Sequence, residues 1–137
     1  MTQPRIFITH RHRYNDHYWT LRHKLRAEFN FQDLSVHDHK FEDDDLPLDF
    51  LLGKIDDQIK RCNVFIAIGR RYVGRAAWCK WEIDRAIQLN KWIATWSPHG
   101  LDPSEAPASV RGYALHLGPF TQARALATKL RALDFAV

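Results

Sequence analysis

The feature that most constrains the fold of this chain is a nearly continuous apolar run, NVFIAIG, at residues 63–69. A strand that lacks alternating polar residues is typical of a parallel sheet covered by helices on both faces. Amphipathic stretches flank this run, and shorter apolar runs follow them along the chain. The alternation predicts an α/β protein built on a parallel sheet.

The periodicity of apolar residues predicts where the strands and helices lie. Strands are expected at 5–10, 31–38, 63–69, 92–96 and 113–118, and helices at 14–29, 48–62, 76–90 and 121–133, the last with Thr121 as its N-cap. Residues 97–107 are expected to form a loop with one short helical turn. Because right-handed crossovers leave few alternatives, a single flavodoxin-like domain spanning 1–137 is predicted, with helices on both faces and strand order 2-1-3-4-5.

The composition narrows the class of protein. With 45% hydrophobic and 26% charged residues, the chain is expected to fold into a globular domain. The net charge of +4 comes from 20 basic residues mixed among 16 acidic ones, which fits a phosphate-bearing partner but makes nucleic acid the less favoured one. Cys62 and Cys79 lack metal or redox spacing, and no apolar stretch approaches membrane length, so a soluble cytoplasmic protein without a membrane partner is expected.

The predicted topology indicates where a ligand would bind. In such sheets the site lies beyond the carboxyl ends of the strands, between strands 1 and 3. The segments expected there are 9–15, 37–45 and 69–78, and they are rich in His and Arg. No aspartate ends strand 3, which excludes a phospho-acceptor receiver domain. A flavodoxin phosphate loop, a P-loop, a dinucleotide fingerprint and a nucleophile elbow are also missing.

Glu82 is the candidate catalytic acid. In a helix that starts near Ala76, Trp78 and Glu82 share a face about 100° from the core-facing stripe, which is expected to contain Cys79, Ile83, Ala86, Ile87 and Asn90. A carboxylate in the second turn could hold a ribose diol and support positive charge at an anomeric carbon. Alternatively, Glu82 is a solvated residue paired with Arg85.

Two polar clusters suggest metal binding only weakly. Four histidines, His10, His12, His37 and His39, follow adjacent strands and could gather near one rim. Loop histidines are more often solvated or bound to substrate. The acidic run at 42–45 lacks the ligand spacing of a calcium loop. No metal site is predicted.

Several motifs together resemble a known family. PRIFITHRH, FQDLSV, IDDQIKRCNVFIAIG and WCKWEIDRAIQLNKWI, over about residues 4–96, resemble the TIR-like domain family of Thoeris antiphage defence systems. More distantly, they are similar to TIR domains that consume NAD. The specific combination is the strand ending FITH, the D-x-S of Asp33 and Ser35, and the W-x-x-x-E of Trp78 and Glu82.

The resemblance implies an enzyme that cleaves the nicotinamide–ribose bond of NAD+ through Glu82. NAD+ would be the substrate, with no separate cofactor. The product would be a cyclic or conjugated ADP-ribose signal that activates a nucleotide-sensing effector protein. The resemblance also implies a homo-oligomer formed through the loop after the second strand. A non-catalytic TIR-like interaction module and a nucleotide transferase remain alternatives.

The resemblance and the three segments together predict the substrate-binding residues. Trp78 belongs to the same motif as Glu82, and Arg75 stands, with two alanines, where the family often has a serine. An arginine there could change how ribose or phosphate is held. The predicted substrate-binding set is Thr9, His10, Arg11, Ser35, Asp38, Gly69, Arg75 and Trp78.

Overall fold

The structure is a computed structural model that describes residues 3–9, 16–35, 49–68, 77–97 and 108–133. Strands and helices alternate along the chain, as the apolar pattern predicts. The elements are β1 (Arg5–Thr9), α1 (Asp16–Arg26), β2 (Gln32–Asp33), α2 (Asp49–Arg61), β3 (Val64–Ile68), α4 (Ala77–Gln88), β4 (Trp92–Trp96), α5 (Ala108–Arg111), β5 (His116–Phe120) and α6 (Ala123–Ala132).

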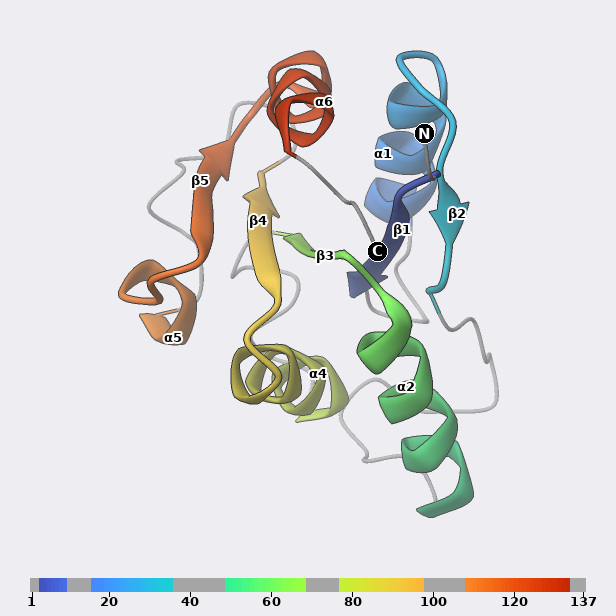
Figure 1. The fold of residues 1–137 in the computed structure, drawn as a ribbon, viewed down its shortest axis with the longest axis vertical. Helices are drawn as coiled ribbons and strands as arrows, with labels where there is room; N and C mark the ends of the chain where they lie inside the picture. Colours follow the sequence, from blue (N-terminus) through green and yellow to red (C-terminus); the bar gives the residue numbers. More distant parts are fainter. Residues whose placement is uncertain (1–2, 10–15, 36–48, 69–76, 98–107, 134–137) are drawn as a thin grey trace.

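The strands form one parallel sheet in the order β2-β1-β3-β4-β5 (Figure 1). The chain therefore starts in the interior of the sheet, moves to one edge with β2, and crosses back to β3. The predicted flavodoxin-like fold is confirmed. The point where the strand order reverses lies between β1 and β3, whose ends pair at Thr9 and Ala67.

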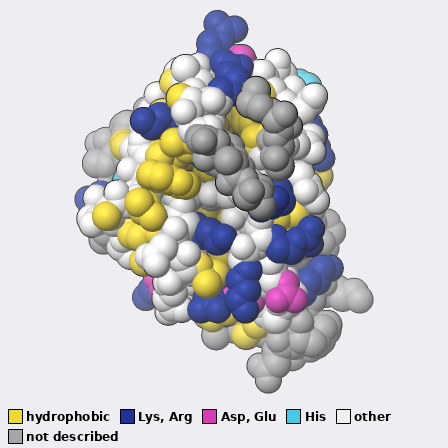
Figure 2. All heavy atoms as spheres, in the orientation of Figure 1, with side chains coloured by type: hydrophobic (Ala, Val, Ile, Leu, Met, Phe, Trp, Pro, Cys, Tyr) yellow, Lys and Arg dark blue, Asp and Glu magenta, His cyan; other side chains and the backbone are white. Residues whose placement is uncertain are grey.

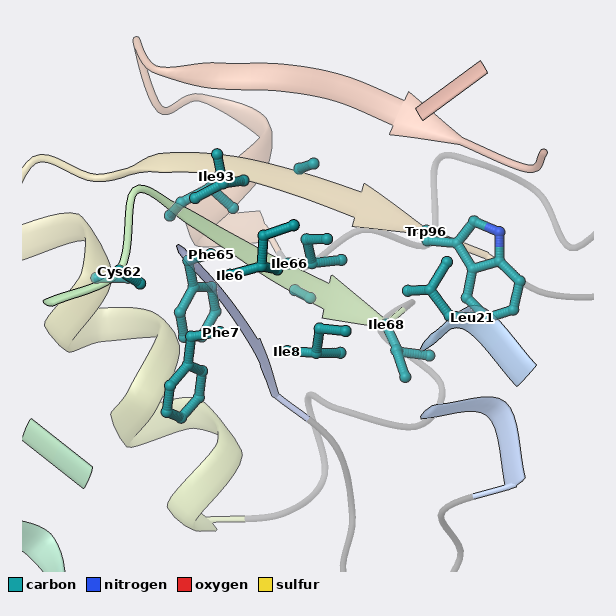
Figure 3. Close-up of a cluster of buried hydrophobic side chains, with 14 of the residues drawn as sticks. Ile6, Phe7, Ile8, Leu21, Cys62, Phe65, Ile66, Ile68, Ile93 and Trp96 are labelled. Atoms are coloured by element: carbon teal, nitrogen blue, oxygen red, sulfur yellow. The ribbon is translucent and has the colours of Figure 1, made fainter. Parts of the chain in front are cut away.

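Helices cover both faces of the sheet (Figure 1). Helices α1 and α6 pack together on one face, and α2 and α4 pack together on the other. Side chains alternate between the faces along each strand. In Figure 3, Ile8 and Ile68 point to the side of Leu21 on α1, whereas Phe7 points the other way.

The α2/α4 face has an aromatic centre. The rings of Phe7 and Phe65 are stacked with their centroids 5.3 Å apart, and both side chains are buried. Cys62 and Cys79 are buried free thiols, as expected from their spacing. The outer surface is mixed: Figure 2 shows lysine and arginine side chains spread over the visible face, with acidic and hydrophobic ones between them.

The last strand and the last helix begin later than predicted. Strand β5 starts at His116 instead of residue 113 and continues through Gly118 and Pro119, which an edge strand tolerates because its outer side needs no partner. The predicted N-cap Thr121 is wrong, since Gln122 occupies that position and makes no side-chain capping bond. The short helix α5 was not predicted.

Strand β2 is shorter than predicted, because Leu34 and Ser35 lie outside it, while residues 36–38 of the predicted range are not among those described. The remaining boundaries differ less. Strand β4 agrees with its predicted range, while α1 ends at Arg26, before the predicted end at residue 29. The core-facing stripe of α4 is correct for Cys79, Ile83 and Ala86, which are buried. It is wrong for Asn90, which is exposed and adopts a left-handed φ of 56° beyond the end of the helix. No helix in the described ranges is long and apolar enough to cross a membrane.

Candidate active site

The candidate site lies where β1 ends and α4 begins its second turn. Thr9 is the last residue of β1, and Glu82 lies on the helix that follows β3. Both belong to the side of the sheet that faces α2 and α4. Because Thr9 ends β1, the site is at the carboxyl edge of the sheet. It lies beside the reversal of strand order, where such folds bind ligands.

Glu82 is buried and contacts the strand directly. Its side chain is 1% exposed, as is that of Thr9, and the Thr9 hydroxyl donates a hydrogen bond to the Glu82 carboxyl group. The alternative of a solvated glutamate paired with Arg85 is wrong. Arg85 instead forms an ion pair with Asp56 of α2.

This environment keeps Glu82 uncharged at neutral pH. Burial raises the pKa of Glu82 from its ordinary value of 4.5 to about 8, and the hydrogen bond from Thr9 lowers it only in part. No charged side chain within the described ranges contributes to this shift. A cation placed beside the carboxyl group would lower its pKa and favour the ionised form.

Ser35 lies at the same edge but is held by the protein. Its hydroxyl accepts a hydrogen bond from the backbone N–H of Ile8 at 2.9 Å, and its own N–H donates to Asp33 Oδ1 at 2.9 Å. Because Thr9 follows Ile8, the D-x-S motif lies directly beside the strand end that contacts Glu82. The resemblance predicted Ser35 as a substrate-binding residue, and that role stays a prediction; its contacts with Ile8 and Asp33 were not predicted.

Of the other predicted site residues, the structure describes the backbone of Trp78. Trp78 lies in the first turn of α4, on the same helix as Glu82. The remaining substrate-binding candidates, namely His10, Arg11, Asp38, Gly69 and Arg75, lie outside the described residues, as do the four histidines and the acidic run. Among the residues that are described, no group of histidine, cysteine and acidic side chains could hold a metal ion.

The residues that surround Asp33 were not predicted from the sequence. The side chain of Asp33 is 7% exposed and accepts hydrogen bonds from the Tyr18 hydroxyl and, at 3.0 Å, from Arg22 Nε. Tyr18 and Arg22 are four residues apart on α1, so their shared face was a usable signal. Their partner on β2 could not be identified from this spacing.

Two further polar side chains lie on the two strands at the β5 side of the sheet. Thr95 on β4 is in register with Ala67, and its hydroxyl lies 3.1 Å from Nε2 of His116 on β5. Burial lowers the pKa of His116. At the end of β4, the buried Trp96 has an indole N–H with no acceptor in the described part of the chain.

These features define a doubly wound α/β protein of the flavodoxin-like class with a buried acid at the reversal of strand order. The chain belongs to the family described as Thoeris protein ThsB, TIR-like domain, whose profile matches residues 7–102. The matched region contains both Thr9 and Glu82. The predicted family is confirmed.

A solved structure has the same fold. The chain is similar to the Clostridium botulinum CMP N-glycosidase BcmB, with a TM-score of 0.59 and 17% sequence identity, covering 94% of this chain and 99% of that one. At this identity the similarity supports the fold. No curated protein sequence matches the chain significantly.

Proposed function

We propose that this protein cleaves the N-glycosidic bond between nicotinamide and ribose in NAD+, with Glu82 as the catalytic residue. The products would be nicotinamide and an ADP-ribose-derived signalling nucleotide of antiphage defence, in cyclic, conjugated or linear form. The observation that carries the proposal is the buried Glu82 carboxyl group, hydrogen-bonded to Thr9 at the ligand-binding edge of the sheet. Membership of the Thoeris TIR-like family supports it.

The chemistry of NAD+ suits a buried acid that has no cationic partner among the described residues. The nicotinamide ring is a pyridinium, so the breaking bond leaves its electron pair on the ring nitrogen, and nicotinamide departs neutral without a proton. Positive charge then develops on the ribose, where an ionised carboxylate stabilises it. The approaching pyridinium lowers the pKa of Glu82 below its value of about 8 in the empty site and promotes this ionisation.

The decisive experiment incubates NAD+ with concentrated wild-type protein and with Glu82→Gln, and follows both products by mass spectrometry. The wild type is expected to release nicotinamide, and the variant to lose at least about 10³-fold of the rate because the carboxylate is gone. The mass of the second product identifies the signalling nucleotide. Equal release by both proteins would overturn the role of Glu82, and silence of both at high concentration would contradict NAD+ cleavage.

A second candidate substrate is a pyrimidine nucleoside monophosphate, because the similar solved structure is a CMP N-glycosidase. Here the base leaves with a negative charge unless it is protonated, and a protonated Glu82 could supply that proton. The pH dependence of kcat/KM separates the two candidates. For NAD+ it is expected to rise as pH increases through about 8, the pKa of Glu82 in the free protein, whereas for CMP it is expected to fall over the same range.

The proposal includes the partners that the resemblance implies. The product would act on a nucleotide-sensing effector in the cytoplasm, and copies of this chain would associate with one another. Adding the reaction mixtures of the wild type and of Glu82→Gln to an effector separates signalling by product from signalling by contact. If both mixtures activate the effector equally, the protein is a non-catalytic interaction module. Added free bases that enter the product would indicate a nucleotide transferase.

A further inference from the structure

A second buried acid, Asp33, lies on β2 at the side of β1 away from β3. It is held from two directions. From α1, the Tyr18 hydroxyl and Arg22 Nε both donate to Oδ2, the latter at 3.0 Å, and from the end of β2 the N–H of Ser35 donates to Oδ1 at 2.9 Å. Tyr18 is fully buried. The acid therefore joins the helix over one face of the sheet to the segment that follows β2.

The contact of Ser35 with β1 continues the backbone pairing of the two strands. Backbone N–H groups of Gln32 and Leu34 donate to carbonyl groups of β1 and of the residue before it, at 2.8 Å each. Further along β1, the backbone N–H of Ile8 donates a hydrogen bond to the Ser35 hydroxyl at 2.9 Å, so the acceptor here is a side chain and not a backbone carbonyl. The Ser35 side chain thus extends the pairing along β1 beyond the last backbone hydrogen bond from β2.

The next residue along β1 is Thr9, the hydrogen-bond donor to Glu82. On its other side, Thr9 is in register with Ala67 of β3. The strand end that carries the donor is thus held by β3 on one side and by Ser35 on the other. Since Ser35 is itself held by Asp33, a continuous series of contacts runs from α1 to the candidate catalytic acid.

We propose that Tyr18, Asp33 and Ser35 form a positioning device that sets the Thr9 hydroxyl against Glu82. In this arrangement Ser35 acts through β1 and is a positioning residue instead of a substrate contact. The inference rests on the proposed function for its catalytic consequence. Its structural consequence, the strength of the hydrogen bond between Thr9 and Glu82, is measurable without any substrate.

The test compares Tyr18→Phe with Tyr113→Phe. Both variants delete one phenolic hydroxyl that donates a hydrogen bond: Tyr18 donates to Asp33, and Tyr113 donates to the backbone carbonyl of Lys91 at 2.8 Å, outside the positioning device. Protein labelled with ¹³C at the glutamate carboxyl groups is titrated by NMR. The signal of Glu82 is assigned by its disappearance in Glu82→Gln.

Loosening the strand end weakens the donor that lowers the pKa of Glu82, so Tyr18→Phe is expected to raise this pKa by about half a pH unit. The kcat for nucleotide cleavage is expected to fall about tenfold with KM little changed. Tyr113→Phe is expected to alter neither quantity. If Tyr18→Phe does not fold, Ser35→Ala provides the same comparison, because it removes the acceptor for the Ile8 N–H.

An unchanged pKa of Glu82 in Tyr18→Phe would overturn the inference, and so would an equal change in Tyr113→Phe, which would indicate a general loss of stability. If the wild type cleaves no nucleotide, the proposed function fails while the titration still decides the positioning role. Conversely, nucleotide cleavage with an unshifted Glu82 titration leaves the proposed function intact and removes the positioning device.

Discussion

Asp33 and Glu82 are two nearly buried acids on either side of β1, and their surroundings affect them in opposite directions. Burial alone would raise the pKa of Asp33, but the hydrogen bonds it accepts, led by those from Ser35 and Tyr18, hold that pKa below the ordinary value. Glu82 has one described donor, Thr9, and burial raises its pKa to about 8. Asp33 is thus an ionised, satisfied acid, whereas Glu82 is a neutral one.

The difference distinguishes an acid that supports the fold from an acid available for chemistry. A buried acid whose oxygens accept several hydrogen bonds and face a cation stabilises the folded state when ionised. A buried acid with a single donor destabilises the folded state wherever the unfolded chain would ionise it. Such a residue is a candidate functional group, because a ligand can supply the missing partner.

The largest expected effect is the pH dependence of stability that Glu82 imposes. Below pH 4.5 the acid is protonated in both the folded and the unfolded chain. Between pH 4.5 and about 8 the unfolded chain loses this proton while the folded protein keeps it, so the free energy of unfolding falls as pH rises. The loss should be on the order of 3–5 kcal/mol and should be constant above pH 8.

Denaturant unfolding of the wild type and Glu82→Gln across this pH range measures the effect. The amide can still accept the hydrogen bond from Thr9 but cannot ionise. The variant is therefore expected to be more stable than the wild type at pH 8 and to match it near pH 4. Parallel pH profiles for the two proteins would show that Glu82 does not have the raised pKa.

Asp33→Asn should have the opposite effect on stability. The variant is expected to lose about 2–3 kcal/mol at pH 7, because Tyr18 and Arg22 lose an ionised acceptor. Stability from an acid of lowered pKa is present above its ordinary value of 3.8 and is lost as pH falls through the folded pKa. The difference from wild type should thus shrink below about pH 4.

Thermal unfolding of Asp33→Asn against pH checks this expectation. Asp57→Asn is a matched control, because Asp57 is exposed on α2. It should change the unfolding midpoint little at any pH. If Asp33→Asn were no less stable than the control at pH 7, the two acids would not differ in the way described.

The smallest expected effect concerns Thr9, the donor to Glu82 that the structure describes. Thr9→Val keeps the shape of the side chain and removes the hydroxyl, so it should raise the pKa of Glu82 by about one pH unit. Thr9→Ser keeps a donor and should leave the pKa near the wild-type value. NMR titration of the Glu82 carboxyl group distinguishes the two variants, and an equal pKa in both would show that Thr9 does not stabilise the ionised form.

The sheet order was predictable from sequence because each apolar strand and amphipathic helix has its own local period. Boundaries were less predictable where a local rule competes with a tertiary contact. Gly118 and Pro119 indicate the end of a strand, yet both lie within β5, where pairing with β4 needs only one side of the backbone. Thr121 is a good N-cap by type, but α6 starts one residue too late for it to serve.

By itself, the sequence determined that the chain alternates strands and helices, that the candidate site is expected beyond β1 and β3, and that Glu82 falls in the second turn of α4. These follow from local periodicity and a small set of allowed topologies. Only the tertiary structure decided that Glu82 is buried, that Thr9, 73 residues away, is its partner, and that Asp33 is kept ionised by Ser35 together with contacts from α1. Burial and pKa depend on which distant side chains share a desolvated space, and helical spacing carries no information about that.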